Sequence, residues 1–229
     1  MNTRVRQGLL VTALLPGTVF AGIDKVYDPY VSAGEKEIEI RGIHSQDKTD
    51  NHRLKIGLGY GVNDVWFIEG YLNADKSRGQ DAEFDETELE NKFQLTAKGR
   101  HWLDLGLLTE VEKKRGKNLW ELKAGPVMQK QNDRWVTTVN LLLVSQFGSD
   151  KRDNAITGLE RIQVKYRHSR ALEPGLEYHH DDTTSAIGPV LLGTLHWGTK
   201  PVIWSLGAFA GLNNTTADTT LRWNLEWEF

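Results

Sequence analysis

The last stretch of the chain, TTLRWNLEWEF (Thr219–Phe229), alternates between two kinds of side chain. Every second position carries a large apolar residue, and these residues are Leu221, Trp223, Leu225, Trp227 and Phe229. Polar or charged residues stand between them. A period of two is that of a β-strand, because successive side chains of a strand point to opposite faces. One face of this strand is therefore apolar and aromatic, and the other is charged.

The same alternation recurs along the chain, and no segment of useful length has the period of a helix. We predict strands at 36–46, 52–62, 64–74, 84–97, 101–113, 118–131, 134–147, 156–168, 172–181, 190–198, 201–212 and 219–229. The first and ninth of these alternate least clearly, so ten strands is the alternative count. The pattern predicts an all-β chain of consecutive antiparallel strands.

The connections between the predicted strands are of two kinds that alternate. Short turns are expected at 62–64, 98–100, 132–133, 168–172 and 198–200, and longer loops at 47–51, 75–83, 114–117, 148–155, 182–189 and 213–218. Short turns at one end and longer loops at the other are typical of outer-membrane barrels. We therefore predict a single antiparallel up-and-down transmembrane β-barrel. Aromatic residues gather near the short turns, as an interfacial girdle would require. They are Tyr60, Trp66, Trp102, Trp135, Tyr166, Trp197, Trp204, Trp227 and Phe229.

The N-terminus has the pattern of a secretory signal peptide. Arg4 and Arg6 precede an apolar stretch, which ends at Val19-Phe20-Ala21. We expect cleavage after Ala21, with 22–35 as a periplasmic N-terminal segment and 36–229 as the barrel. A position of 22–35 inside the lumen is the alternative. The chain has no Cys, which excludes disulfides, thiolate metal sites and a lipid-anchored Cys. Its net charge of −3 gives no indication of a nucleic-acid partner.

The terminal Phe229 on a strand of alternating aromatic and polar residues resembles the C-terminal assembly signal of Gram-negative outer-membrane proteins. With the signal peptide and the hairpin pattern, the whole chain resembles small outer-membrane β-barrels of Gram-negative bacteria. This resemblance implies a location in the outer membrane, with the lipid bilayer around the barrel. It also implies that the outer-membrane assembly machinery recognises the last strand through Leu221, Trp223, Leu225, Trp227 and Phe229.

The polar faces of the strands are expected to line the lumen. The charged candidates are Glu88, Glu90, Lys92, Arg161, Lys165, Arg167, Arg222, Glu226 and Glu228. Their mixed signs fit a network of paired charges, or a polar pore lining in which Arg161, Lys165 and Arg167 form a positive rung. Twelve strands lie between the filled interior of about eight and the wide channel of about sixteen. We therefore expect a narrow channel for small polar solutes or an occluded structural barrel.

An outer-membrane enzyme that acts on a lipid or envelope substrate is the alternative function. His179-His180 followed by Asp181-Asp182 is the one cluster of His and carboxylates seen in the sequence. Neighbouring strand residues point to opposite faces, which disfavours a shared metal ion. Ser185 and His179 are the only candidate pair for catalysis, and no nucleophile or metalloprotease motif accompanies them. The sequence assigns no catalytic residue, cofactor or metal. Gly57, Gly59 and Gly61 alternate and are expected on one crowded inner face.

Overall fold

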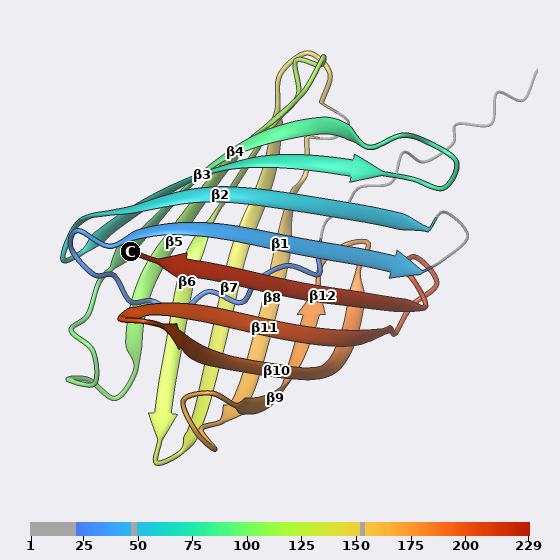
Figure 1. Ribbon diagram of the computed structural model, residues 1–229. Helices are drawn as coiled ribbons and strands as arrows, with labels where there is room; N and C mark the ends of the chain where they lie inside the picture. Colours follow the sequence, from blue (N-terminus) through green and yellow to red (C-terminus); the bar gives the residue numbers. More distant parts are fainter. Residues whose placement is uncertain (1–21, 47–49, 152–153) are drawn as a thin grey trace, which may run out of the picture.

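The protein forms a closed barrel of twelve antiparallel strands in a computed structural model that describes residues 22–46, 50–151 and 154–229 (Figure 1). Each strand pairs with its neighbours in sequence, and β12 pairs with β1 to close the ring. This confirms the predicted all-β fold and the count of twelve. The described residues contain no helix that is long and apolar enough to cross a membrane. The proposed signal peptide lies outside the described residues.

The strands have similar lengths, and most begin or end within three residues of the predicted positions. They are β1 (Lys36–Gln46), β2 (Asn51–Asn63), β3 (Trp66–Lys76), β4 (Glu83–Gln94), β5 (Asp104–Lys114), β6 (Trp120–Asn132), β7 (Trp135–Phe147), β8 (Ile156–Tyr166), β9 (Glu173–His180), β10 (Ser185–Trp197), β11 (Lys200–Gly211) and β12 (Thr219–Glu228). We call the end of the barrel that carries Phe229 the C-terminal rim and the other end the opposite rim.

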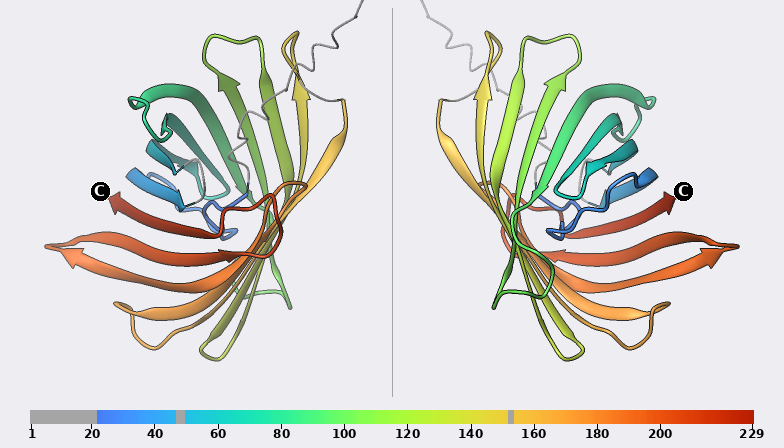
Figure 2. Two further views of the ribbon diagram at one scale, coloured as in Figure 1. Left: turned by 90° about the vertical axis from the view of Figure 1, so that its right-hand side faces the viewer. Right: turned by 90° about the vertical axis from the view of Figure 1, so that its left-hand side faces the viewer.

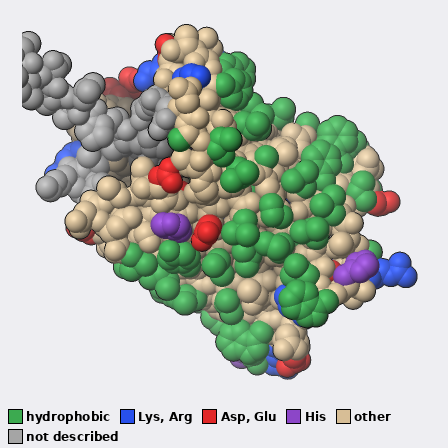
Figure 3. All heavy atoms as spheres, turned by 180° about the vertical axis from the view of Figure 1, so that it is seen from behind, with side chains coloured by type: hydrophobic (Ala, Val, Ile, Leu, Met, Phe, Trp, Pro, Cys, Tyr) green, Lys and Arg blue, Asp and Glu red, His purple; other side chains and the backbone are tan. Residues whose placement is uncertain are grey.

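The outer face of the barrel is apolar. On β12, Leu225 is 47% exposed whereas its neighbour Asn224 is 6% exposed, and the same alternation runs along the other strands. Hydrophobic side chains cover much of the outer face seen in Figure 3. An apolar exterior of this extent is what a barrel surrounded by hydrocarbon requires.

Aromatic side chains stand at the C-terminal rim, where the alternation predicted a girdle. Trp135 contacts Tyr166 with ring centroids 5.1 Å apart, and Trp227 contacts Phe229 at 5.8 Å. The opposite rim has Trp120 stacked on Phe147 at 6.0 Å. Amphipathic rings favour the headgroup level of a bilayer, so the two rims fit its two interfaces.

The connection between β4 and β5 is longer than predicted. The sequence suggested strands up to residue 97 and from residue 101, but the structure leaves 95–103 outside both strands. The carboxylate of Asp104 accepts a hydrogen bond from the backbone N–H of Gly99 at 2.8 Å, and Gly99 has a positive φ of 69°. This local turn takes the backbone out of the ladder, so the strict alternation of short and long connections is wrong at this point.

The strand β10 begins earlier than predicted, at Ser185 instead of residue 190. Proline has no backbone N–H to donate to a ladder, so Pro189 must lie where that bond is not needed. In the structure Pro189 lies opposite Leu176 of β9, and the pairing of β10 with β11 is interrupted between Ile187 and Val190. Pro189 therefore occupies a position where the ladder needs no backbone donor. The connection between β9 and β10 is residues 181–184, which is shorter than the loop predicted at 182–189.

Candidate functional site

The lumen is crossed by residues 22–35, which we call the plug segment. It runs inside the ring of strands before the chain enters β1 (Figures 1 and 2). At the C-terminal rim, Gly34 N–H donates to the carbonyl of Gly61, and Gly61 N–H donates to that of Glu35, both at 2.8 Å. At the opposite rim, Gly22 lies against Thr184 and Asp181. Residues 22–35 thus run from one rim to the other within the ring of strands, the alternative that the sequence left open beside a periplasmic position.

Ion pairs fix the first part of the plug segment to the barrel wall. Asp24 pairs with Arg41 of β1 and, at 3.1 Å, with Lys55 of β2. Lys25 pairs with Glu39 of β1 at 2.6 Å and with Glu226 of β12 at 2.7 Å. Charges that are removed from water need partners of opposite sign, and the plug segment supplies them to the wall.

A side-chain amide holds the middle of the plug segment. Asn140 of β7 accepts a hydrogen bond from Tyr27 N–H and donates one to the Tyr27 carbonyl, each at 2.8 Å. Both backbone groups of Tyr27 are thus satisfied by one fully buried residue. The Tyr27 ring packs into an apolar cluster with Leu108, Val127, Leu142 and Leu159 of β5 to β8.

The lumen is therefore not lined by polar residues alone. Besides the cluster around Tyr27, a second apolar cluster consists of Ala186, Val190 and Phe209 on β10 and β11, with Ile23 of the plug segment packed against it. Sequence alternation missed these inward apolar residues, because it assumed that the whole inner face would meet water. They face the plug segment, which explains why their side chains are apolar.

The plug segment is also held near the C-terminal rim. The Tyr30 hydroxyl donates to Asp104 at 2.7 Å and accepts from Gln129 at 2.9 Å, and Val31 N–H donates to Gln94 at 2.9 Å.

A row of carboxylates crosses the wall formed by β3, β4 and β5. Glu69 of β3, Glu90 of β4 and Glu110 of β5 lie directly opposite one another in the ladder. All three are at most 2% exposed, and each has a carboxylate oxygen with no hydrogen-bond partner among the described residues. Lys123 pairs with Glu110 at 3.0 Å, whereas no ion pair with a described residue reaches Glu69 or Glu90. The row gives this wall an excess of acidic groups.

The nine charged residues that were predicted to line the lumen differ in how deeply they are buried. Glu88, Glu90, Arg161, Arg222 and Glu226 are buried inside the barrel, where Glu88 pairs with Lys55 at 2.8 Å. Lys92 lies over the Phe67 ring, and half-buried Glu228 lies opposite Glu37 in the ladder.

The suggested positive rung does not form. Arg161 is buried and donates to the carbonyl of Lys25, but Lys165 pairs with Glu173 at 2.7 Å, and Arg167 lies beyond the end of β8, near the same Glu173. Only Arg161 of the three thus faces the middle of the lumen. The other two belong to an ion-pair group at the C-terminal rim.

The histidine pair behaves as the strand geometry predicted. His179 is fully buried and its Nε2 lies 2.9 Å from Glu177, which also pairs with Arg222 at 2.8 Å. His180 is exposed on the other face and lies opposite Ser185 in the ladder. Ser185 is therefore on the outward face of β10 and His179 on the inward face of β9, so the structure does not bring this pair together for catalysis.

Several residues of the site were missed in the sequence. Asp24, Tyr27 and Asn140 take part in the plug contacts, and the only available signal was an isolated Asn inside the apolar run of 135–147. A second histidine–carboxylate cluster was also missed. His44 and His52 are eight positions apart and flank a hairpin, and a cross-strand pairing test would have placed them side by side.

Comparisons with known proteins support the fold. No family model matches the chain, and no curated protein matches it by sequence. Among solved structures, it resembles the COG4313 outer membrane channel from Pseudomonas putida F1, with a TM-score of 0.61, 12% identity, and coverage of 90% of this chain and 100% of that one. It also resembles the KdgM porin in complex with disordered oligogalacturonate, with a TM-score of 0.56, 11% identity, and coverage of 84% and 99%.

These likenesses and the apolar exterior define the class of the protein. It has the fold of an outer-membrane β-barrel, and its apolar outer face suits a surrounding of lipid. Within that class it is a twelve-stranded barrel whose lumen holds its own N-terminal segment.

Proposed function

We propose that the protein is a narrow outer-membrane channel for small polar solutes, and that residues 22–35 hold it closed in the structure described here. The observation that carries this proposal is the path of the plug segment, which runs from Gly34 at one rim to Gly22 at the other. A strand count of twelve gives an interior wider than the filled eight-stranded barrels. The width is taken up by one extended segment, so removal of that segment would leave a continuous path.

The character of the lining favours cations and neutral polar solutes. Among the buried charged side chains of the described residues, eleven are acidic and five are basic. Rings and rows of carboxylates select for cations in channels. A negatively charged sugar polymer, such as the oligogalacturonate named with the KdgM porin, would meet repulsion along the row of Glu69, Glu90 and Glu110.

Recording in planar bilayers tests the channel. We compare the chain from residue 22 onward, a variant that lacks residues 22–33, and the single variant Asn140→Leu, which removes both hydrogen bonds to Tyr27. Asn214→Leu is the matched control, since Asn214 is exposed in the connection between β11 and β12. We expect small or rare conductance steps from the unmodified chain and from Asn214→Leu, more frequent opening of Asn140→Leu, and a steady larger conductance from the shortened variant.

Silence of all four folded proteins would overturn the channel and support an occluded structural barrel. Equal conductance of the unmodified and shortened chains would show that the plug segment does not close the lumen. Migration on gels with and without heating establishes that each variant is folded before it is recorded.

The orientation follows from the same proposal. Cleavage after Ala21 would leave Gly22 as the mature N-terminus, and the C-terminal rim would face the periplasm. N-terminal sequencing of the purified protein tests the cleavage site. Because the chain has no Cys, single cysteines label cleanly. A membrane-impermeant thiol reagent on intact cells should modify Asp81→Cys, at the opposite rim, and miss Asp64→Cys in the β2–β3 turn. The reverse labelling would invert the orientation.

A further inference from the structure

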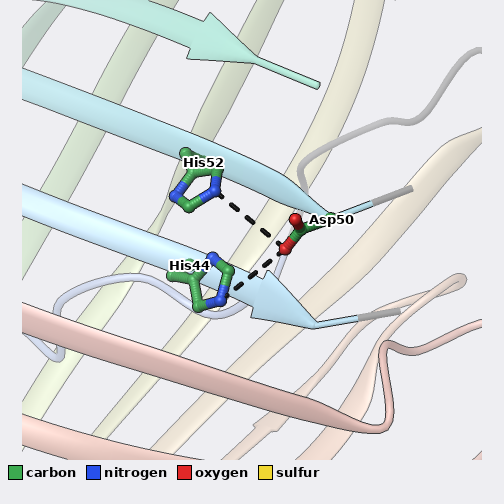
Figure 4. Close-up of side chains that lie close together, drawn as sticks. All are labelled: His44, Asp50 and His52. Carbon is green, nitrogen blue, oxygen red and sulfur yellow. Dashed lines mark ion pairs between the residues drawn. The ribbon is translucent and has the colours of Figure 1, made fainter. Parts of the chain in front are cut away.

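Two imidazoles and a carboxylate converge on the outer surface near the opposite rim. His44 of β1 and His52 of β2 lie directly opposite each other in the ladder, with ring centroids 4.2 Å apart and planes inclined by 26°. Asp50, just before β2, directs its carboxylate between them (Figure 4). Its Oδ1 lies 3.7 Å from His44 Nε2 and 4.0 Å from His52 Nε2.

The spacing of these three groups fits a metal ion. Zinc bonds to imidazole nitrogen and carboxylate oxygen measure about 2.0–2.2 Å, which puts the ligand atoms of a tetrahedral site roughly 3.3–3.6 Å apart. One donor atom from each of the three residues lies within 4.8 Å of the others. Small side-chain rotations that move the donor atoms by about one ångström would bring all three within bonding distance of one ion. A water would then take the fourth position.

The location allows an ion to enter from solvent. His44, His52 and Asp50 have side-chain exposures of 34%, 50% and 38%. The two histidines occupy the outward face of β1 and β2 that carries Ile40, Leu54 and Ile56 nearer the middle of the barrel. They are therefore at the edge of the apolar belt and separate from the ion pairs of the lumen.

We propose that His44, Asp50 and His52 form a binding site for a divalent transition-metal ion of the zinc class. Two nitrogen donors and one oxygen donor suit Zn²⁺, Co²⁺, Ni²⁺ and Cu²⁺, whereas Ca²⁺ and Mg²⁺ prefer sites made of oxygen. The bound ion joins β1 to β2 next to the seam where β1 meets β12. This site has no role in the channel proposal, so the two stand or fall separately.

Zinc titration of the folded, untagged protein tests the site. Isothermal calorimetry after chelator treatment and dialysis is expected to show one saturable Zn²⁺ site, and Co²⁺ is expected to give the visible absorption of a nitrogen-ligated ion. His44→Ala and His52→Ala should each weaken Zn²⁺ binding at least tenfold. The matched control is His196→Ala, since His196 is an exposed histidine near the C-terminal rim, and its binding should be unchanged. Ca²⁺ should produce no saturable signal at the same concentrations.

The contribution of Asp50 needs a variant that leaves the backbone intact. Asp50 has a positive φ of 49°, a conformation that asparagine tolerates, so Asp50→Asn removes the charge with little backbone strain. It should also weaken Zn²⁺ binding at least tenfold. Unmodified affinity in Asp50→Asn would overturn the three-residue site, and unmodified affinity in both histidine variants, or no saturable Zn²⁺ binding to the unmodified protein, would overturn the proposal as a whole. Heat-modifiable migration on gels shows that each variant has folded.

Discussion

Adjacent residues of one strand occupy very different surroundings in this barrel. Leu225 faces outward and is half exposed to the medium around the barrel, while Asn224 points inward, opposite Arg41 of β1. Asn224 is only 6% exposed, so it lies among other side chains of the interior. An arginine at Asn224 would therefore meet Arg41. A test for surrounding lipid is better made with two outward residues at different depths in the membrane than with one inward and one outward residue.

Replacement of Leu225 by arginine tests whether β12 crosses hydrocarbon. Leu225→Arg should lower the free energy of unfolding by about 2–4 kcal/mol if Leu225 lies near the midplane. Leu212→Arg is the matched control, because Leu212 is 55% exposed but follows β11 at the opposite rim, where the same change costs about 0–1 kcal/mol. Urea unfolding in lipid vesicles measures both, and equal losses would contradict a membrane around this face.

A substitution at Gly61 tests how tightly the plug segment packs against the barrel wall. A Cβ at Gly61 would overlap the Ser32 carbonyl oxygen, and Gly61 also exchanges two backbone hydrogen bonds with residues 34 and 35. We expect Gly61→Ala to displace the plug segment and to increase its cleavage by a protease added to folded protein in micelles. Gly70→Ala is the control, because a Cβ there meets no atom within 4 Å. Equal protease resistance of the two variants would count against tight packing at Gly61.

At the scale of elements, alternation predicted the strands because lipid imposes it. β12 could be recognised from its outward residues alone, since hydrocarbon tolerates few polar side chains. The end of β4 and the start of β10 could not, because they depend on the Asp104 turn and on an interrupted ladder at Pro189. The plug contacts were beyond reach for another reason. Asp24 contacts Arg41 because the plug segment crosses the lumen and β1 then runs back along the wall beside it. No local sequence pattern indicates this contact.

The last strand closes the barrel, and its terminal residue takes part. Phe229 N–H donates to the carbonyl of Lys36 at 2.8 Å, and the Phe229 ring contacts Trp227. We predict that Phe229→Lys lowers the amount of folded protein in the outer-membrane fraction severalfold, since the proposed assembly signal ends on an aromatic residue. Phe229→Tyr keeps the ring and the backbone bond and should assemble normally. Immunoblots of unheated samples give the folded fraction, and normal assembly of Phe229→Lys would refute the signal.

At the scale of the whole molecule, the charges and apolar groups of the plug segment complement those of the barrel wall. The wall formed by β12 and β1 to β4 is predominantly acidic, and the wall formed by β5 to β11 holds the apolar clusters. The plug segment lies between them, with Lys25 toward the carboxylates and Tyr27 and Ile23 toward the apolar residues. The plug segment is therefore amphipathic, with a charged side toward the acidic wall and an apolar side toward the apolar clusters. Its removal would expose the acidic wall to the solution in the lumen.

That exposure predicts the ion selectivity of the opened barrel. In a gradient of KCl, the variant that lacks residues 22–33 should show a reversal potential on the cation-selective side, because Glu69 and Glu90 have no ion-pair partner among the described residues. Glu69→Gln combined with Glu90→Gln in this background should move the reversal potential toward zero while the conductance persists. Glu160→Gln is the matched control, since Glu160 is exposed on the outward face of β8 and should leave the potential unchanged. An anion-selective potential in the shortened variant, or no shift on neutralising both glutamates, would show that Arg41, Lys55 and Arg161 dominate the field in the lumen instead.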